Sequence, residues 1–514
     1  MVARQWWEKP WLLLAITLLA ALPLLWPATP PLVDVPGHIG RYRVELDLAA
    51  SPTLQRYFDF KWALIGNLGV DLLIMPLNAL FGLETGTKIA VLFIPVLTTL
   101  GLLLTAREIH GRIPATAFFA VPFVYGYPFN FGFINFSLSM AFALLAFALW
   151  LRMRAKSRLV RALIFVPLSC LIWLTHAFGW GALGLLVWSA ELIRERDLGK
   201  TWFGSAVGAA FEAALLALPI VLMIAWRSAG VAGTTSGYLG IQSKIFSIAA
   251  AMRDRWLIWD TFGVTVAVVL IGAAKFDRQL EFSRRLMIPA ATLFVAYMLM
   301  PTQVFGSAYA DMRLAPYMLM LGVLSVRFRN PEPSGGAGLL ASLGLLFVAA
   351  RLLGNTISFA LADFEIRSDL EALSYIPKGA PVLSIIGNDC NKSWSMPIHS
   401  HLGSFVITRR QGFSNDQWQL SGAQLLRVHY PAARDFAADP SETIFSKACL
   451  AKTAKTLKPG QHLSRSLDQA LNEFPRQAFD YVWVIKPVDW DGRPPPDLTR
   501  LWSNSESTLY RVAH

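Results

Sequence analysis

Long apolar segments separated by short basic connections run through most of this 514-residue chain and constrain its fold more than any other feature. Hydrophobic residues make up 54% of the sequence, charged residues only 16%, and the mean hydropathy is +0.46. A soluble domain usually carries about 25% charged residues. Because a helix of about 20 apolar residues can cross a bilayer, we expect an all-α polytopic membrane domain.

Eleven segments are predicted to span the membrane, and the shorter ones require a thinned bilayer or snorkelling side chains. They lie approximately at residues 11–27, 87–106, 113–128, 133–151, 162–175, 178–193, 204–226, 257–274, 286–301, 314–326 and 337–354. The first segment is interpreted as a retained helix rather than a cleaved signal peptide, because no clean small-residue cleavage site follows it.

The basic residues gather in one set of connections. Lys and Arg number 18, against six Asp and Glu, in the intervals 1–10, 107–112, 152–161, 194–200, 275–285 and 327–329. Residues 28–86, on the opposite side, carry four basic and six acidic residues. This asymmetry predicts a cytoplasmic N-terminus in the inner (plasma) membrane. It also accounts for the net charge of +12 without nucleic-acid binding, which we exclude.

Residues 71–83 are apolar enough to resemble a twelfth span. Counting them would place the five basic residues of 152–161 outside, against the charge rule. About 13 residues are also too few to cross. We therefore predict an amphipathic helix along the membrane surface, within a long structured external loop at residues 28–86.

The composition changes after the last predicted span. The transmembrane domain is expected to cover residues 1–358, and residues 359–514 are expected to form a soluble α/β domain. Its helices are predicted at 369–375 and 467–474, and its strands at 380–386, 481–485 and 507–512. An odd number of spans from a cytoplasmic N-terminus places this domain in the periplasm or outside the cell.

Two of the three cysteines, Cys390 and Cys449, lie in this external domain. One disulfide between them is compatible with an oxidising compartment, but the sequence leaves the pairing open because it gives no Cα separation. Cys170 lies in an apolar segment and is interpreted as a small buried hydrophobic residue.

Asp34 and His38 belong to the motif Asp-Val-Pro-Gly-His, directly after the first apolar segment. If a helix begins at Pro36, the carboxylate lies at its N-terminal end and the imidazole one turn further along, so both can face one point. The alternative for Asp34 is a purely structural role as a helix cap. An imidazole beside a carboxylate can bind a divalent cation or transfer a proton.

Other polar residues are predicted at the same membrane face. His176 ends the fifth segment, Asp311 and Arg313 precede the tenth, and Asn130 and Asn135 stand in an aromatic turn. Ionisable residues at membrane depth are functional candidates because their desolvation must be compensated. The structural alternatives are a hydrogen-bonded core role for His176 and an ion pair between the two charged residues.

An acidic residue after the first helix, a long first external loop, many spans and an external C-terminal domain together resemble the GT-C superfamily of membrane glycosyltransferases. The similarity covers the architecture of the whole chain. At the residue level it is confined to the surroundings of Asp34, with residues 130–151 and 311–316 similar to bacterial members. The chain departs from better-known members because no paired acids follow the first helix and the loop around Asn130 lacks an acid.

The resemblance implies transfer of a sugar from a polyprenyl-phosphate donor to a glycan, lipid or protein acceptor on the outer face of the membrane. It implies a catalytic or metal-binding Asp34, and we expect His38 to assist it. Candidate substrate-binding residues are Arg313, Asp311, His176, Asn130, Asn135 and Arg41. Candidate ligands for a divalent cation, Mg²⁺ or Mn²⁺, are Asp34, His38 and His176. Of the cations near this face, Arg313 is favoured for phosphate binding, ahead of Lys244, Arg253 and Arg255.

The main alternative is a non-catalytic transporter or flippase for a lipid or polysaccharide. Transporters place ionisable residues near the middle of their spans, where this sequence has only Glu212 as a clear case. This favours chemistry at the interface. A third interpretation is a sensor or assembly factor acting through the external domain. Its candidate residues are Trp394, His399, His401, Arg409 and Arg410.

Overall fold

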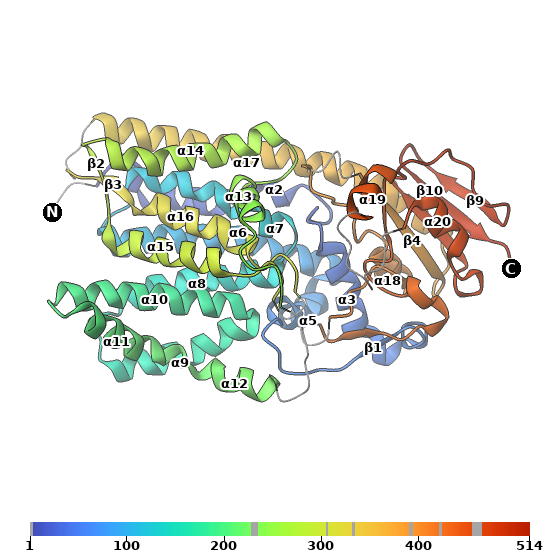
Figure 1. The fold of residues 1–514 in the computed structure, drawn as a ribbon, viewed down its shortest axis with the longest axis horizontal. Coiled ribbons are helices and arrows are strands. Elements are labelled where there is room, and N and C mark those ends of the chain that lie inside the picture. Colours follow the sequence, from blue (N-terminus) through green and yellow to red (C-terminus); the bar gives the residue numbers. More distant parts are fainter. Residues whose placement is uncertain are drawn as a thin grey trace. The chain divides into compact units, whose positions relative to one another are not determined.

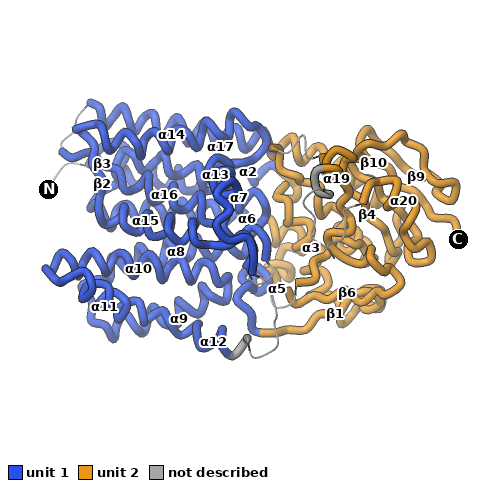
Figure 2. Tube along the Cα trace, in the orientation of Figure 1, with its two compact units in different colours: residues 1–26, 64–73, 89–358 blue, residues 27–63, 74–88, 359–514 orange. Residues whose placement is uncertain are grey.

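The computed structural model describes residues 4–227, 235–304, 307–330, 335–389, 394–420, 424–454 and 465–514. The chain divides into two compact units, shown in Figure 2. Unit 1 comprises residues 1–26, 64–73 and 89–358, and unit 2 comprises residues 27–63, 74–88 and 359–514. Most of the predicted first external loop therefore belongs to the same unit as the C-terminal part of the chain.

Unit 1 is helical (Figure 1). The helices that form it, wholly or in part, are α1 (Pro10–Leu19), α2 (Leu22–Leu25), α5 (Gly69–Phe81), α6 (Leu83–His110), α7 (Tyr127–Asn130), α8 (Ile134–Arg152), α9 (Arg158–Thr175), α10 (Ala177–Asp197), α11 (Trp202–Ala213), α12 (Leu218–Arg227), α13 (Ile241–Ala249), α14 (Leu257–Phe276), α15 (Arg284–Leu299), α16 (Ala315–Ser325) and α17 (Gly335–Leu370). Four 3-10 segments accompany them: η1 (Trp6–Glu8), η3 (Ala115–Tyr125), η4 (Ala214–Leu216) and η5 (Met312–Leu314).

Helical structure is present in each of the eleven predicted segments. Among the described residues, five helices are long and apolar enough to cross a membrane, and six if the bent pair of α11 and α12 is one span. The other segments are shorter, broken or more polar; residues 113–128, for example, form the 3-10 segment η3, which contains Pro122. This architecture is that of an integral membrane protein, whereas the number of eleven spans stays a prediction.

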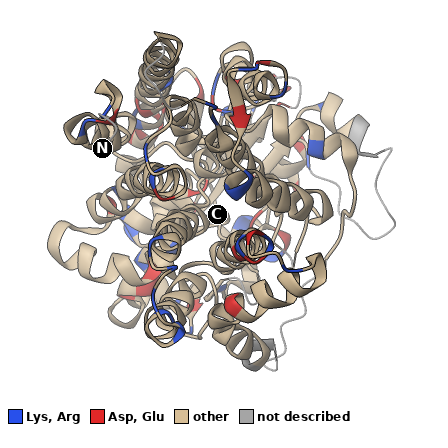
Figure 3. Cartoon of the chain, turned by 90° about the vertical axis from the view of Figure 1, so that its left-hand side faces the viewer, with Lys and Arg blue, Asp and Glu red and all other residues tan. Residues whose placement is uncertain are grey.

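The basic connections of the sequence gather at one end of unit 1. Arg284, at the start of α15, lies 3.2 Å from Asp197 at the end of α10. His110, at the end of α6, contacts the carbonyl oxygen of Leu324 in α16 at 2.9 Å. The short strands β2 (Leu280–Phe282) and β3 (Val326–Phe328) pair antiparallel at the same end. Figure 3 shows the charged residues as scattered coloured segments on a ribbon that is mostly uncharged.

Helix α17 differs from the prediction. The sequence was interpreted as a span at 337–354 and a separate helix at 369–375, but one helix runs from Gly335 to Leu370 and continues as η6 (Glu371–Tyr375). The residues between the two predicted elements contain no proline or glycine after Gly354, so nothing interrupts the helical backbone.

Unit 2 contains a mixed six-stranded sheet in the order β5-β4-β8-β10-β9, with β7 also paired to β4. The strands are β4 (Pro381–Asn388), β5 (Phe413–Ser414), β7 (Thr443–Phe445), β8 (Tyr481–Ile485), β9 (Leu498–Ser503) and β10 (Ser507–Val512). Strand β4 is parallel to β5, β7 and β8, and β10 is antiparallel to β8. The helices α18 (Ser404–Arg410), α19 (Lys447–Ala454) and α20 (Leu467–Glu473) complete this part. The predicted strands and the predicted helix at 467–474 are confirmed.

The predicted first external loop is structured, and the part of it that belongs to unit 2 packs on the C-terminal part of that unit. Helix α3 (Val35–Asp47) contacts α18, and strand β1 (Phe58–Phe60) pairs antiparallel with β6 (Leu426–Val428). Helices η2 (Leu48–Ala50) and α4 (Pro52–Gln55) lie between them in sequence. The predicted surface helix is present as α5, and its position along a membrane stays a prediction. Cys390 lies outside the described residues, so its disulfide with Cys449 also stays a prediction.

Candidate functional site

Asp34 immediately precedes helix α3 in unit 2, and it is 8% exposed. The backbone N–H of His38 donates to the Asp34 carbonyl oxygen at 3.0 Å, so the first turn of the helix closes on Asp34. The Asp34 side chain makes no capping hydrogen bond. The helix thus begins at Val35, one residue before the predicted start. Capping does not account for this buried carboxylate.

Two histidines flank the ring of Trp418 beside Asp34. The ring centroids of His38 and His401 lie 5.2 and 4.4 Å from the centroid of Trp418. Gly37 permits this approach, because a Cβ atom at its position would lie 2.6 Å from a ring carbon of Trp418. The glycine of the motif therefore serves close packing between α3 and the C-terminal part of unit 2.

His401 faces the Asp34 carboxylate, with Nε2 3.7 Å from Oδ1. His401 Nδ1 lies 2.9 Å from the carbonyl oxygen of Asp416, which can only accept, so Nδ1 carries the proton. Burial lowers the pKa of His401, so the imidazole is neutral near pH 7. Nε2 therefore presents a lone pair to the carboxylate. Both atoms are acceptors, so a proton or a cation between them would relieve their repulsion.

Arg41 lies in α3 and is only 2% exposed. Its guanidinium donates to the side-chain oxygen of Gln424 and stands 5.2 Å from the ring centroid of Tyr42. Burial and two contacts fix the position of this charge within unit 2, one turn along the helix from His38. A fixed guanidinium of this kind is suited to bidentate binding of an anion.

His176 and Arg313 meet in unit 1. The Nδ1 atom of His176 accepts a hydrogen bond from the Phe178 N–H at 3.1 Å, so His176 caps the N-terminus of α10. The ring proton must then reside on Nε2, which lies 3.4 Å from Nη1 of Arg313. Both groups are hydrogen-bond donors. An anionic oxygen placed between them could accept from both.

The guanidinium of Arg313 is 4.1 Å from the ring centroid of Phe133 and also donates to Ser307 Oγ at 3.0 Å. Asp311 does not pair with it, which corrects the predicted alternative of an ion pair between these two residues. Asp311 instead accepts from Lys244 Nζ at 3.1 Å, and both side chains are buried. The charge of Lys244 is thereby compensated within the protein.

The side chains of Asn130 and Asn135 form hydrogen bonds between segments of unit 1. Asn130 donates to the carbonyl oxygens of Tyr125 and Arg253, each at 3.0 Å. Asn135 accepts from the Val70 N–H at 2.7 Å and donates to Asp71 at 2.9 Å. These bonds give both residues of the aromatic turn a structural role. Their expected contact with substrate stays a prediction.

The predicted site residues therefore form two groups. Asp34, His38 and Arg41 lie in unit 2, whereas the other five lie in unit 1. Convergence of both groups on one cavity stays a prediction, and so does a metal site shared by Asp34, His38 and His176. Sequence reasoning placed His401 only among the sensor candidates and missed Trp418, because no spacing in the sequence connects position 34 with residues about 370 positions later.

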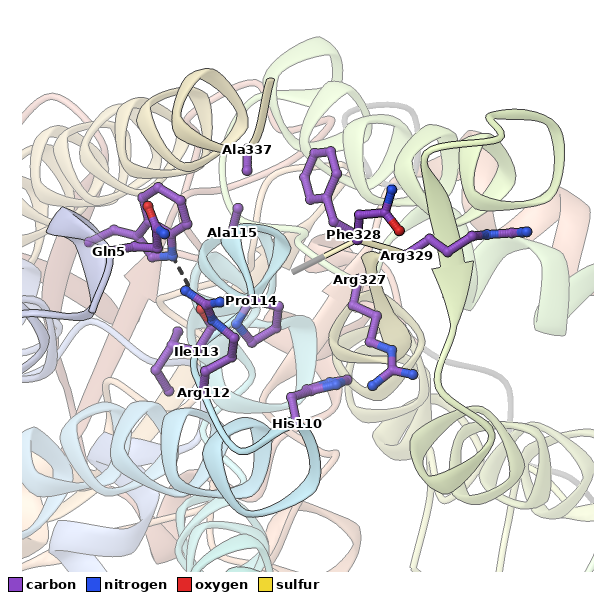
Figure 4. Close-up of a pocket in the computed structure, with 12 residues that line it drawn as sticks. Gln5, His110, Arg112, Ile113, Pro114, Ala115, Arg327, Phe328, Arg329 and Ala337 are labelled. Atoms are coloured by element: carbon purple, nitrogen blue, oxygen red, sulfur yellow. Dashed lines mark hydrogen bonds between the residues drawn. The ribbon is translucent and has the colours of Figure 1, made fainter. Parts of the chain in front are cut away.

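A cavity of about 270 Å³ lies in unit 1 (Figure 4). It is lined by Gln5, Trp7, His110, Arg112, Ile113, Pro114, Ala115, Arg327, Phe328, Arg329, Asn330 and Ala337. It is located at the end of unit 1 that carries the basic connections. Two of the arginines that line the cavity already form ion pairs within the protein. Arg112 pairs with Glu8 at 3.0 Å, and Arg327 pairs with Glu281 at 2.8 Å.

No protein-family model matches the sequence, and no curated protein does. Solved structures match over nearly the whole chain. A crystal structure of ArnT from Cupriavidus metallidurans bound to undecaprenyl phosphate aligns with a TM-score of 0.50 and 11% identity, over 98% of each chain. The apo structure of the same protein aligns with a TM-score of 0.47 and 12% identity, over 97% of each chain. The chain therefore has a GT-C-like fold, as its resemblance to that superfamily led us to expect.

Proposed function

We propose that this protein is a membrane glycosyltransferase that transfers a sugar from a polyprenyl-phosphate donor to an acceptor on the outer face of the inner membrane. The observation that carries the proposal is Asp34, a buried carboxylate at the start of α3 that does not cap its helix. Support also comes from the GT-C-like fold, since the similar ArnT structure holds undecaprenyl phosphate. The acceptor is a glycan, a lipid or a protein.

In the proposed reaction, an acceptor hydroxyl oxygen forms a bond to the sugar C1 while the bond from C1 to the phosphate oxygen breaks. Asp34 accepts the hydroxyl proton as general base. The polyprenyl phosphate leaves with the bonding electrons. Arg41, the buried guanidinium of helix α3, stabilises its negative charge. His38, which packs beside Trp418 in the first turn of α3, is expected to position the Asp34 carboxylate just before that helix.

Glu212 was the one ionisable residue expected near the middle of a span, where transporters place such residues. Its carboxylate lies 3.1 Å from Arg161, which also pairs with Glu191 at 3.0 Å. The Arg161 side chain is 3% exposed, so these carboxylates compensate a buried charge. Glu212 thus has a structural partner at the basic end of unit 1, which favours the glycosyltransferase over a transporter or flippase.

The test is Asp34→Asn, which keeps the size of the side chain and removes its charge. Purified protein in proteoliposomes would be given a panel of undecaprenyl-phosphate sugars and cell-envelope acceptors, and released undecaprenyl phosphate would be measured. We expect the variant to insert and fold normally while its rate falls by at least about 100-fold, the lower range for a lost general base.

Asp59→Asn is the matched control, because Asp59 lies in strand β1 of the same unit with its side chain exposed. It should keep the wild-type rate. A wild-type rate in correctly inserted Asp34→Asn protein would contradict the proposal. In that case, movement of labelled lipid or polysaccharide across the vesicle membrane would support the transporter.

A further inference from the structure

Three side chains of unit 2 that no part of the proposed reaction uses lie together. His401, Asp439 and Glu442 each direct a ligand atom to one place, and these atoms lie within 4.8 Å of one another. His401 comes from the turn before α18, and the two acids come from the segment before β7. His401 is 5% exposed and Glu442 is 1% exposed, so the cluster is not a solvated acidic surface.

Within the part of the chain that the structure describes, no lysine or arginine compensates the carboxylates of this cluster. Glu442 Oε1 accepts from Thr443 at 3.1 Å, whereas Oε2 is buried without a hydrogen-bond partner. Within the described residues, no lysine or arginine forms an ion pair with Asp439 or Glu442. Burying a carboxylate without a partner is strongly unfavourable, and two adjacent carboxylates add repulsion. A cation or a shared proton resolves both problems.

The orientation of His401 favours a cation. Its Nδ1–H donates to the Asp416 carbonyl oxygen at 2.9 Å, which leaves the Nε2 lone pair for a ligand. Metal-binding histidines typically donate their other ring N–H to a carbonyl or a carboxylate in this way.

We propose that His401, Asp439 and Glu442 bind a divalent transition-metal cation, Zn²⁺ or Mn²⁺. One imidazole with carboxylates suits these ions, whose ligand bonds are about 2.0–2.2 Å long. In a tetrahedral site such bonds place ligand atoms about 3.4 Å apart. Rotation of the two acidic side chains closes the remaining gap. This site does not depend on the proposed transferase activity, and its test measures metal rather than transfer.

The experiment uses the full-length protein with an affinity tag free of histidine. Protein stripped with a chelator is incubated separately with Zn²⁺, Mn²⁺ and Mg²⁺, dialysed, and analysed for bound metal and for its thermal unfolding midpoint. We expect about one Zn²⁺ or Mn²⁺ per chain and a higher midpoint, because a ligand bound only to the folded state stabilises it. His401→Gln, Glu442→Gln and Asp439→Asn should each weaken binding at least 10-fold and lose the shift.

His429→Gln and Glu473→Gln are the matched controls, since both residues lie in unit 2 outside the cluster. They should bind metal like the wild type. Equal metal content in the three cluster variants would place the ion elsewhere and overturn the proposal. A wild-type protein that binds none of the ions would overturn the proposal, and a metal-independent rise in the midpoint of Glu442→Gln would then show that the two carboxyl groups share a proton.

Discussion

Asp254 lies three residues before helix α14 and is 6% exposed. Its backbone N–H donates to the Asp260 carboxylate at 2.8 Å, and Asp260 pairs with Arg351 at 3.3 Å. Burial, and then the charge of Asp260, raise the pKa of the Asp254 carboxyl from 3.8 to about 7. Its proton is therefore bound more tightly in the folded than in the unfolded protein.

This shift predicts a pH dependence of stability. A raised carboxyl pKa contributes stability that is fully present below the unfolded pKa and is lost as pH rises through the folded pKa. The wild-type unfolding midpoint in detergent should therefore fall between about pH 4 and pH 7. Asp254→Asn should remove this part of the fall. At pH 8 its midpoint should exceed that of the wild type by at least about 2 °C.

Differential scanning fluorimetry from pH 4 to pH 9 would measure these midpoints. Asp491→Asn is the control, because Asp491 is exposed and should leave the profile unchanged. Parallel profiles for wild type and Asp254→Asn would show that the buried carboxyl does not titrate in this range.

At the scale of elements, the contact between α8 and α10 depends on small residues. A Cβ atom at Gly179 of α10 would lie 2.6 Å from the backbone carbonyl carbon of Ser139 in α8. A Cβ atom at Gly184, in the same helix, would meet nothing within 4 Å. Small residues at helix contacts in membranes let backbones approach closely. The two glycines are thus a matched pair within one helix.

We expect Gly179→Ala to lower the unfolding midpoint, because α10 must move away from α8, which disturbs His176 at the start of α10. Gly184→Ala should keep or raise the midpoint, since alanine is favoured over glycine in a helix by about 1 kcal/mol. Thermal unfolding of both purified variants in the same detergent measures the difference. Equal midpoints would mean that the helices do not pack this closely.

At the scale of the whole molecule, the positive-inside asymmetry predicts a cytoplasmic N-terminus, eleven spans and an external C-terminus. The gathering of the basic connections at one end of unit 1 agrees with one cytoplasmic face. Reporter fusions after Pro333 and after His514 should then report opposite sides of the membrane. Fusions that report the same side would show that the helix after Pro333 does not cross the membrane, and the eleven-span topology would be wrong.

The sequence predicted elements wherever one physical signal was sufficient. Strand β8 was predicted with its observed bounds, because five consecutive apolar and aromatic residues, Tyr481–Ile485, are typical of a strand buried on both faces. The start of α3 followed from Pro36, whose fixed φ favours the first turn of a helix. Helix α17 was predicted in two pieces because its sequence changes from apolar to more polar along its length. The helix continues through this change, because its backbone hydrogen bonds do not depend on whether the side chains are apolar.

The sequence by itself determined that the chain enters a membrane, which connections are basic and that Asp34 follows the first apolar segment, because hydropathy and charge are local properties. Only the tertiary structure decided that His401 and Trp418 lie beside Asp34, that Lys244 rather than Arg313 pairs with Asp311, and that β1 pairs with β6. These contacts join residues far apart in the chain. Their formation depends on how whole elements pack, and no residue type or spacing encodes that packing locally.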